Sequence, residues 1–202
     1  MGKINQKNKL VEELRIIGSG FIDPETVAAD WNIKKGEVVA DLGCGGGYFT
    51  IPTARMVGDE GKVYAVDVME GPIESVKSRA YLAGLSNIIA IRADLEGKES
   101  LSKWVKAGEC DKVLLANVLY TSKKKNAIIS EARRILKKKG NLIVVEWKKK
   151  IEEGQEKIKY FGPPEKTRIS GKELKDMLKK SGFKFIRGFE AGNFHFGMVL
   201  EK

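Results

Sequence analysis

Short apolar runs rich in valine, isoleucine and leucine alternate along the chain with segments in which apolar residues recur every three or four positions. The runs are typical of strands buried on both faces, and the segments between them are typical of amphipathic helices. This pattern predicts an α/β protein with a mostly parallel sheet and helices on both of its faces. The five strands that it predicts are residues 38–42, 62–66, 88–92, 112–116 and 142–146.

Helix ends are also visible in the sequence. Asp23 is a predicted N-cap, and Pro24 after it takes the first helical position. Pro72 takes the same position in a second predicted helix that ends at Gly84, and a third predicted helix precedes Gly140. The apolar faces of these three helices are Val27, Ala28 and Trp31; Ile73, Val76, Ala80 and Ala83; and Ile128, Ala132, Ile135 and Leu136.

The pattern changes after the fifth strand, because residues 148–168 are charged, contain glycine and proline, and show no long apolar period. The sequence Ser170-Gly-Lys-Glu173 is a capping box, so we expect a helix from there to Gly182. Two strand-like runs follow at 183–189 and 194–200. The linker between them is too short for the crossover of a parallel pair, so the two runs should form an antiparallel hairpin and complete a seven-stranded sheet.

The length of 202 residues and the hydrophobic content of 42% predict a single domain with a sizeable core. Within it we expect an N-terminal helical cap at 1–36, a ligand-binding core at 37–147, a surface excursion at 148–169, and a C-terminal helix and hairpin at 170–202. No run approaches the roughly 20 apolar residues of a membrane-spanning helix, and the N-terminus lacks an apolar secretory core. We therefore expect a soluble, cytoplasmic protein.

The two cysteines, Cys44 and Cys110, are too few for a disulfide framework and form no Cys-x-x-Cys pair. We expect both to be reduced, buried side chains, and we expect no metal site.

The formal net charge of +10 raises the question of nucleic acid, because clustered lysine and arginine form phosphate-binding surfaces. The basic clusters are at 123–125, 133–139 and 148–150. They lie at predicted helix ends, where the helix dipole favours cations, and heat-adapted proteins are also rich in lysine and glutamate. A solvated surface is the favoured interpretation, and RNA stays open as a partner.

The first predicted strand leads directly into the glycine-rich loop Asp41-Leu-Gly-Cys-Gly-Gly-Gly47, and a helical run at 48–57 follows. The loop therefore lies at the carboxyl end of a strand, where open α/β sheets bind ligands. Glycines let the backbone approach a ligand closely and present N–H groups at a helix N-terminus. A tight turn between strand and helix also needs glycines, so the loop alone does not define a site.

Two acidic residues should lie on the same edge of the sheet, because Asp67 ends the second predicted strand and Asp94 follows the third. A carboxylate at the position of Asp67 can accept both hydroxyls of a ribose. Asp94 can accept from the exocyclic amine of an adenine, although an aspartate there can also serve as a turn residue. The three strand ends together predict a site for a nucleoside-containing cofactor.

A dinucleotide such as NAD is the rival ligand, since the glycines and Asp67 would serve it equally. However, Tyr48 stands where the dinucleotide fingerprint has its last glycine. Asp41 also precedes the loop, where its charge would repel a pyrophosphate but attract the amino group of a methionine moiety, directly or through water. The predicted antiparallel hairpin is foreign to the dinucleotide fold as well.

Residues 38–50, Val-Val-Ala-Asp-Leu-Gly-Cys-Gly-Gly-Gly-Tyr-Phe-Thr, resemble the first motif of class I S-adenosylmethionine-dependent methyltransferases, particularly the small-molecule group that includes enzymes like those of ubiquinone and menaquinone biosynthesis. Segments 62–67, 90–94 and 111–117 resemble the second, third and fourth motifs, and 131–140 resembles the stretch before strand five. The resemblance runs from about residue 27 to the C-terminus. It implies a Rossmann-like fold with an antiparallel seventh strand and S-adenosylmethionine as cofactor, and it does not identify the methyl acceptor.

The resemblance also implies which residues bind the cofactor. The loop from Asp41 would hold the methionine portion, Asp67 the ribose, and the residues after the second and third strands the adenine, while Asn117 would lie near the sulfonium. The full set is Asp41, Gly43, Cys44, Gly45, Gly47, Asp67, Val68, Met69, Asp94, Leu95 and Asn117. The fourth motif departs from an Asn/Asp-Pro-Pro-Tyr run and reads Asn117-Val-Leu-Tyr120, which argues against methylation of an exocyclic base nitrogen.

A sulfonium methyl group is already activated, so its transfer is an in-line displacement that depends mainly on positioning and on a dry pocket. A dedicated general base is not required. If the acceptor must lose a proton, the candidates are Tyr120, Glu146, Tyr160 and His195. Trp147 and Tyr160 could line an apolar acceptor pocket, although core packing is the expected role of Trp147.

Segments 1–36 and 148–169 should cover the acceptor, because the α/β core does not need them. We expect the acceptor to be a small molecule. An RNA (tRNA or rRNA) or protein acceptor is the alternative, and a non-catalytic module that binds S-adenosylmethionine for regulation is a third possibility. The sequence does not indicate an oligomeric state.

Overall fold

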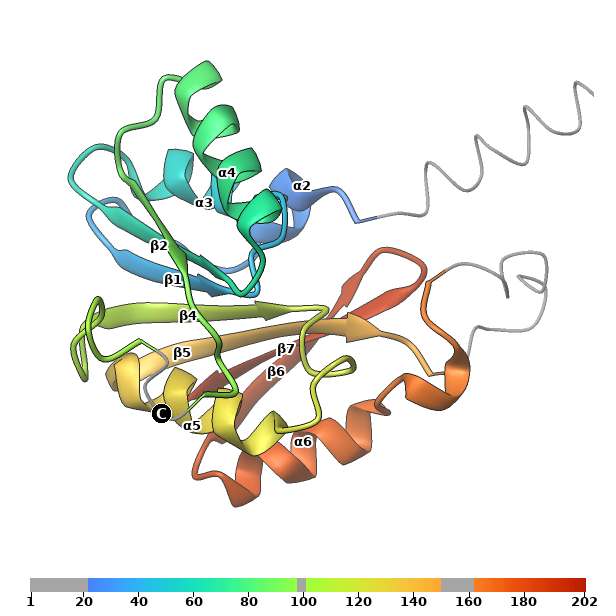
Figure 1. The fold of residues 1–202 in the computed structure, drawn as a ribbon. Helices are drawn as coiled ribbons and strands as arrows, with labels where there is room; N and C mark the ends of the chain where they lie inside the picture. The colour runs from blue at the N-terminus through green and yellow to red at the C-terminus, as the bar shows by residue number, and fades with distance from the viewer. Residues whose placement is uncertain (1–21, 98–100, 150–161) are drawn as a thin grey trace, which may run out of the picture.

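The computed structural model describes residues 22–97, 101–149 and 162–202, in which a seven-stranded sheet forms the centre (Figure 1). The strand order is β3-β2-β1-β4-β5-β7-β6. Strands β1 to β5 pair in parallel, and β7 runs antiparallel to both of its neighbours. The strands are β1 (Val38–Leu42), β2 (Lys62–Asp67), β3 (Ile88–Arg92), β4 (Cys110–Ala116), β5 (Leu136–Trp147), β6 (Lys184–Ala191) and β7 (His195–Glu201).

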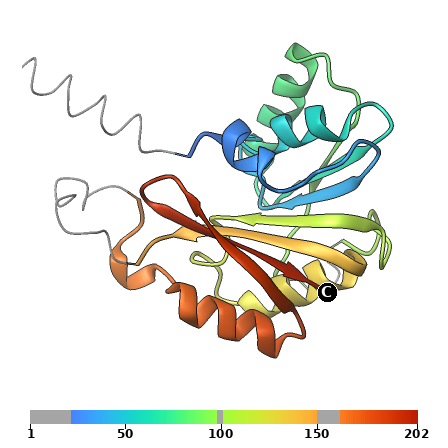
Figure 2. The same cartoon turned by 180° about the vertical axis from the view of Figure 1, so that it is seen from behind.

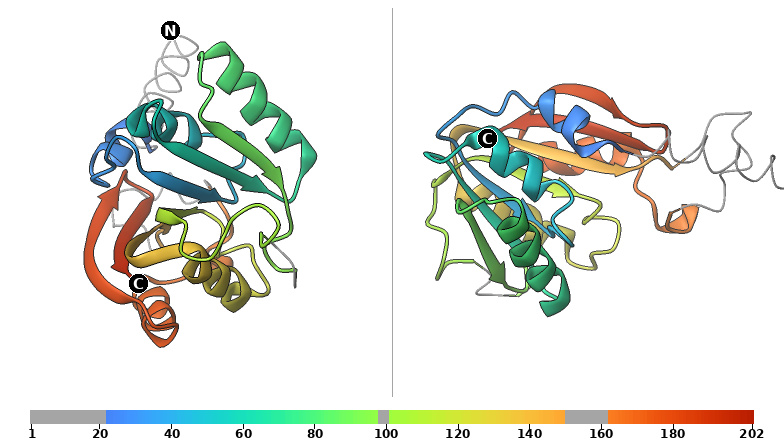
Figure 3. Two further views of the ribbon diagram at one scale, coloured as in Figure 1. Left: turned by 90° about the vertical axis from the view of Figure 1, so that its left-hand side faces the viewer. Right: turned by 90° about the horizontal axis from the view of Figure 1, so that it is seen from above.

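Helices cover both faces of the sheet (Figure 3). One face carries α2 (Pro24–Ala29), α3 (Thr50–Val57) and α4 (Glu70–Leu82), and the other carries α5 (Lys125–Ile135) and α6 (Gly171–Lys180). A short 3-10 helix, η2 (Glu165–Thr167), precedes α6. None of the described helices is long and apolar enough to cross a membrane.

The core has two layers, one on each face of the sheet. The larger layer joins α5 and α6 to the sheet and includes Ile128 and Leu174, which are almost fully buried. The opposite layer includes Ala28 and Trp31. The ring centroids of Trp31 and Phe49 lie 5.1 Å apart. Both cysteines are free and buried, as expected.

The predicted sheet is confirmed in strand content and direction. Strands β1 and β3 have the expected bounds, and β2 and β4 extend slightly beyond them. The C-terminal hairpin is antiparallel, and Figure 2 shows it from the side where β6 and β7 cross in front of β5. Its linker is shorter than predicted, because β6 continues to Ala191 and β7 begins at His195.

Both predicted helix caps are confirmed. The Asp23 side chain accepts a hydrogen bond from the backbone N–H of Glu25 at 3.1 Å, and Pro24 begins α2. Ser170 and Glu173 form the reciprocal bonds of a capping box at the start of α6. These caps satisfy N–H groups that have no partner within the first turn of a helix.

Two predicted helix bounds are wrong. Helix α4 begins at Glu70, so Pro72 lies within its first turn and not at its first position. A proline is tolerated there because the N–H groups of the first turn have no intrahelical acceptor. Helix α5 ends at Ile135, and Leu136 is already extended and pairs with Cys110 at the start of β5. Gly140 therefore belongs to an irregular part of β5 and does not end a helix.

Candidate functional site

The glycine-rich loop joins the carboxyl end of β1 to α3 through three glycines in the left-handed region, with φ of 77° at Gly43, 52° at Gly45 and 82° at Gly47. A Cβ atom at Gly43 would lie 2.4 Å from a methyl carbon of Val118, so the backbone of this loop passes close to the segment after β4. Other residues rarely adopt such φ values, so the backbone conformation requires glycine at these three positions. At Gly43 the contact with Val118 also leaves no space for a side chain.

Asp67 ties this loop to the end of β2. Its Oδ2 accepts a hydrogen bond from the N–H of Gly45 at 3.0 Å, and its Oδ1 accepts one from the N–H of Met69 at 2.9 Å. Hydrogen bonds from backbone N–H groups to a carboxylate are stronger than bonds between neutral groups. The Asp67 carboxylate therefore fixes the relative positions of the first two strand ends.

A cavity of about 330 Å³ opens beside Asp67 at the carboxyl edge of the sheet. Among the expected cofactor residues, its walls include Gly43, Asp67, Val68, Met69, Asp94, Leu95 and Asn117. Its remaining wall residues were not predicted from the sequence and are Ala93, Glu96, Val118, Thr121, Ser122 and Ile128. Most of the missed residues lie in the segment after β4 or on α5; Val118 belongs to the fourth motif, whereas Thr121, Ser122 and Ile128 lie outside the motifs.

Asp94 lines the cavity, and its carboxylate also stabilises the turn in which Asp94 lies. Its Oδ1 accepts a hydrogen bond from the N–H of Glu96 at 2.8 Å. Val68 and Met69, which follow β2 and line the cavity, expose 56% and 59% of their surface.

Asp41, Cys44, Gly45 and Gly47 do not line this cavity. Asp41 is almost fully buried, and its carboxylate accepts a hydrogen bond from the Thr50 hydroxyl at 2.6 Å. Burial raises the pKa of Asp41 to about 7, and the nearby charge of Asp67 acts in the same direction. Burial also raises the pKa of the Cys44 thiol, which therefore has little thiolate character at neutral pH.

A second group of polar residues lies at the ends of β4, β5 and β7. Asn117 follows β4 in a left-handed conformation with φ of 58°, and its Nδ2 lies 3.2 Å from Nε2 of His195. The His195 ring lies against Trp147 with the ring centroids 3.9 Å apart. Within the part of the chain that the structure describes, Asn117 Oδ1 and His195 Nδ1 have no hydrogen-bond partner. Two residues in contact thus each carry one buried polar atom that is unsatisfied among the described residues.

His195 is neutral at physiological pH in this environment. Burial, together with the positive charges of Arg168 and Lys148, lowers the pKa of the imidazole to about 4. Because the Asn117 amide nitrogen can only donate, Nε2 of the neutral ring accepts and Nδ1 carries the proton. His195 therefore offers an N–H donor that has no acceptor among the described residues.

Glu146 anchors the loop that follows β4. Its Oε1 accepts hydrogen bonds from the N–H groups of Leu119 at 2.7 Å and Tyr120 at 3.3 Å. Burial raises the pKa of Glu146 to about 7, and burial with the charge of Glu146 raises the pKa of Tyr120. Tyr160, the remaining acid–base candidate, lies outside the described residues.

Trp147 is packed on both sides at the end of β5. The Arg168 guanidinium carbon lies 5.5 Å from the centroid of its ring, and a Cβ atom at Gly162 would lie 2.6 Å from the ring. Arg168 itself donates to the carbonyl groups of Lys148 and Pro163. The described end of the predicted excursion therefore packs against the Asn117, His195 and Trp147 group.

Known proteins match this chain in sequence and in fold. A family model described as "Methyltransferase domain" matches residues 33–182. A probable cobalt-precorrin-6B C(15)-methyltransferase (decarboxylating) of Saccharolobus solfataricus is 31% identical over 113 residues, which are 55% of this chain and 53% of that protein. The 23S rRNA (uracil(1939)-C(5))-methyltransferase RlmD of Xylella fastidiosa is 34% identical over 114 residues, which are 56% of this chain and 21% of that protein. The chain thus spans about half or less of the length of these relatives.

Among solved structures, an S-adenosylmethionine-dependent methyltransferase from Aquifex aeolicus matches with a TM-score of 0.78 and 25% identity, and the match covers 90% of each chain. The sheet order with its antiparallel β7, the glycine-rich loop after β1 and the match over residues 33–182 agree with one another. The chain belongs to the class I S-adenosylmethionine-dependent methyltransferases.

Proposed function

We propose that this methyltransferase acts on a small-molecule acceptor, which binds at the ends of β4, β5 and β7. The observation that carries the proposal is the contact between the half-buried Asn117 and the buried His195, whose buried Oδ1 and Nδ1 atoms lack partners among the described residues. Unpaired buried polar atoms cost free energy, so they are typical of sites that a ligand completes. Asn117 also lines the cavity beside Asp67, which supports an acceptor site next to the proposed cofactor cavity.

The residues around the cavity fit S-adenosylmethionine. The Asp67 carboxylate lies on the cavity wall and would accept the ribose hydroxyls, while the exposed Val68 and Met69 would flank the adenine. Asp94 with Leu95 would contact the edge of the adenine. The methionine portion would lie over the glycine-rich loop, where the buried Asp41 attracts its ammonium group through the loop or through water.

The cofactor supplies a methyl group that its sulfonium already activates. When bound, it would deliver this methyl group to a nucleophile of the acceptor by in-line displacement, and the electron pair of the carbon–sulfur bond would remain on sulfur. The contribution of this chain is to orient the acceptor in line and to exclude water. His195 Nδ1–H would donate to the acceptor, and Asn117 Oδ1 would accept from it.

Two features favour a small acceptor over RNA. His195 exposes only 2% of its surface, so the polar atoms that would meet the acceptor are recessed. Enclosed sites with a few convergent polar groups on apolar walls, such as the Trp147 ring here, are typical of small-molecule binding. The similarity to a 23S rRNA methyltransferase and the net charge of +10 make RNA the alternative acceptor. The experiment must therefore distinguish an RNA acceptor from a small-molecule acceptor.

The test is transfer of a labelled methyl group from S-adenosylmethionine to fractionated metabolites, RNA and protein of the source organism. We expect label in the metabolite fraction. We also expect His195→Phe, which keeps a ring against Trp147 but removes both nitrogens, to lower kcat/KM for that acceptor about tenfold or more without changing cofactor affinity. Lys179→Ala, at an exposed position of α6, is the control.

Label in RNA with steeply salt-dependent binding would overturn the small-molecule proposal. Tight cofactor binding with no label in any fraction would instead identify a regulatory module. Normal turnover in His195→Phe would show that the acceptor binds elsewhere.

A further inference from the structure

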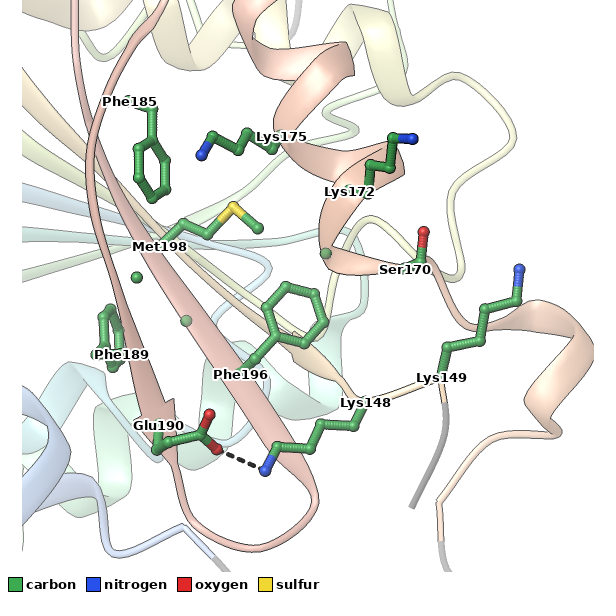
Figure 4. Close-up of a pocket in the computed structure, with 13 residues that line it drawn as sticks. Lys148, Lys149, Ser170, Lys172, Lys175, Phe185, Phe189, Glu190, Phe196 and Met198 are labelled. Carbon is green, nitrogen blue, oxygen red and sulfur yellow. Dashed lines mark ion pairs between the residues drawn. The ribbon is translucent and has the colours of Figure 1, made fainter. Parts of the chain in front are cut away.

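A second cavity, of about 900 Å³, lies between α6 and the β6–β7 hairpin (Figure 4). It has no wall residue in common with the cavity beside Asp67. It also lies on the α5 and α6 face of the sheet, because Phe196 and Met198 pack with the core layer of that face. His195 precedes Phe196 on β7, and side chains of successive strand residues point to opposite faces. The proposed methyl-transfer site does not account for this second cavity.

The floor of the second cavity is apolar and aromatic. Phe185 of β6 and Phe196 and Met198 of β7 face α6, and Figure 4 shows their side chains around the same hollow. Gly188 leaves the floor open, since a Cβ atom added there would meet nothing nearer than the Gly197 carbonyl oxygen at 3.6 Å. A volume of this size is in the range of small-molecule pockets, roughly 300–1,000 Å³.

Four lysines surround this floor. Lys148 pairs with Glu190 at 2.5 Å, and Lys149 lies 3.6 Å from Glu173. Lys172 and Lys175, one turn apart on α6, have no carboxylate within ion-pair distance among the described residues. The Lys175 ammonium lies 3.5 Å from the centroid of the Phe185 ring, so one cation sits directly at the aromatic wall. The rim therefore carries excess positive charge.

The start of α6 adds to this charge. Ser170 and Gly171 line the cavity at the N-terminal end of the helix, where the helix dipole favours an anion. Glu173 opposes this effect in part, because its carboxylate completes the capping box and lies near Lys149. Among the described residues, these four ammonium groups outnumber the two carboxylates of Glu173 and Glu190, which favours a negatively charged ligand.

We propose that this cavity binds a small amphipathic anion, whose apolar body lies on Phe185, Phe196 and Met198 and whose carboxylate or phosphate lies at the lysine rim, nearest to Lys175. Burial of the apolar body supplies most of the affinity, at about 25 cal/mol per Å² of apolar surface removed from water. The lysines supply the selection for negative charge. This proposal does not depend on the identity of the methyl acceptor.

The test uses titration calorimetry on the full chain with four ten-carbon probes below their micelle concentrations: decanoate, decyl phosphate, decanol and decyltrimethylammonium. We expect at least one anion to bind with an affinity tenfold or more above those of the neutral and cationic probes. The comparison of decanoate with decyl phosphate distinguishes a carboxylate ligand from a phosphate ligand. Equal affinity for all four probes would overturn the proposal.

Two kinds of variant locate the binding. Gly188→Leu fills the floor, and Lys172→Glu with Lys175→Glu reverses the rim charge, so each should weaken anion binding at least tenfold. Lys179→Glu with Lys180→Glu is the matched control, because it makes the same change in net charge on exposed residues of α6 outside the cavity. Cofactor affinity reports correct folding and should stay unchanged in Gly188→Leu.

Anion binding that survives Gly188→Leu, or that falls equally in the control pair, would overturn the assignment to this cavity. Displacement of the bound anion by micromolar single-stranded oligouridylate would overturn it as well and would assign the surface to RNA.

Discussion

Asp41 and Asp67 lie on neighbouring strands at the same edge of the sheet, yet their carboxylates have different surroundings. Asp67 accepts two backbone hydrogen bonds at the cavity wall, whereas Asp41 is buried with the Thr50 hydroxyl as its partner. The sequence predicts both residues at the cofactor. The bond from Gly45 to Asp67, which fixes the glycine-rich loop, could not be predicted, because it depends on how β1 and β2 align.

Asp67→Ala should weaken S-adenosylmethionine binding about tenfold to a hundredfold, since hydrogen bonds to charged groups contribute about 1.5–3 kcal/mol. The variant removes the proposed ribose acceptor and releases the N–H of Gly45. Titration calorimetry measures the change, with Asp59→Ala at an exposed position as the control. Unchanged affinity in Asp67→Ala would contradict the assignment of Asp67 to the ribose.

Asp41 should make stability depend on pH. Its pKa of about 7 in the folded state exceeds the value of 3.8 for an unperturbed carboxyl, so between these values the folded state holds a proton that the unfolded state has lost. The free energy of unfolding therefore falls as pH rises through this window and levels off above it. Glu146, with a pKa of about 7, acts in the same direction.

Asp41→Asn keeps the shape of the side chain and an acceptor for Thr50, but it removes the titrating group. We expect urea unfolding at pH 5 and pH 8 to show a smaller loss of stability in Asp41→Asn than in the unaltered chain. Equal losses in the two proteins would show that Asp41 does not carry a raised pKa.

At the scale of elements, the hairpin of β6 and β7 depends on two glycines that differ in their surroundings. A Cβ atom at Gly197 would lie 2.1 Å from a ring carbon of Phe189, whereas one at Gly188 would make only an ordinary contact. Gly197 thus allows the Phe189 ring to lie flat across β7. The hairpin packs on one face through this contact and on the other through Phe185 and Met198.

Gly197→Ala should destabilise the protein by about 1–3 kcal/mol, because an extra carbon forces a shift in a packed region. Gly188→Ala, on the paired strand, should change stability by less than about 0.5 kcal/mol, as surface substitutions usually do. Denaturant unfolding of the two variants side by side is the measurement. Similar losses in both would contradict the difference in packing.

Most elements could be predicted because apolar periodicity and caps mark them locally. Val38–Leu42 and Ile88–Arg92 are mostly apolar runs, and Ser170 with Glu173 marks the start of α6. The junction at Leu136 could not be predicted, since its apolar side chain suits the helix face as well as the strand. Pairing with Cys110, a contact between distant residues, decides in favour of the strand.

The residues of the site also divide into those that the local sequence marks and those that depend on contacts between distant residues. Residues at strand ends, such as Asp67 and Asp94, could be found because each follows a recognisable strand. Thr121 and Ser122 line the cavity from a part of the loop outside the motifs, and the pairing of Asn117 with His195 joins residues far apart in the sequence. Such contacts appear only when the sheet is assembled.

At the scale of the whole molecule, cofactor binding should stabilise the folded state. A ligand present at 100 times its Kd adds about 2.7 kcal/mol, which corresponds to a rise in Tm of about 5–10 °C for a chain of this size. Thermal unfolding with S-adenosylmethionine or S-adenosylhomocysteine should show this rise, and NAD at the same concentration should not. A rise with NAD alone would contradict the cofactor assignment.

The placement of β7 between β5 and β6 has a consequence for synthesis of the chain on the ribosome. Strand β7 is translated after both of its neighbours, and it pairs with β5 over seven residue pairs, from Asn141 with Glu201 to Trp147 with His195. Until it emerges, β5 presents an unpaired, apolar edge of the kind that associates with other chains. A ribosome that stalls or terminates before His195 would therefore release an aggregation-prone fragment, and the nascent chain would benefit from a chaperone that covers β5 until the last strand arrives.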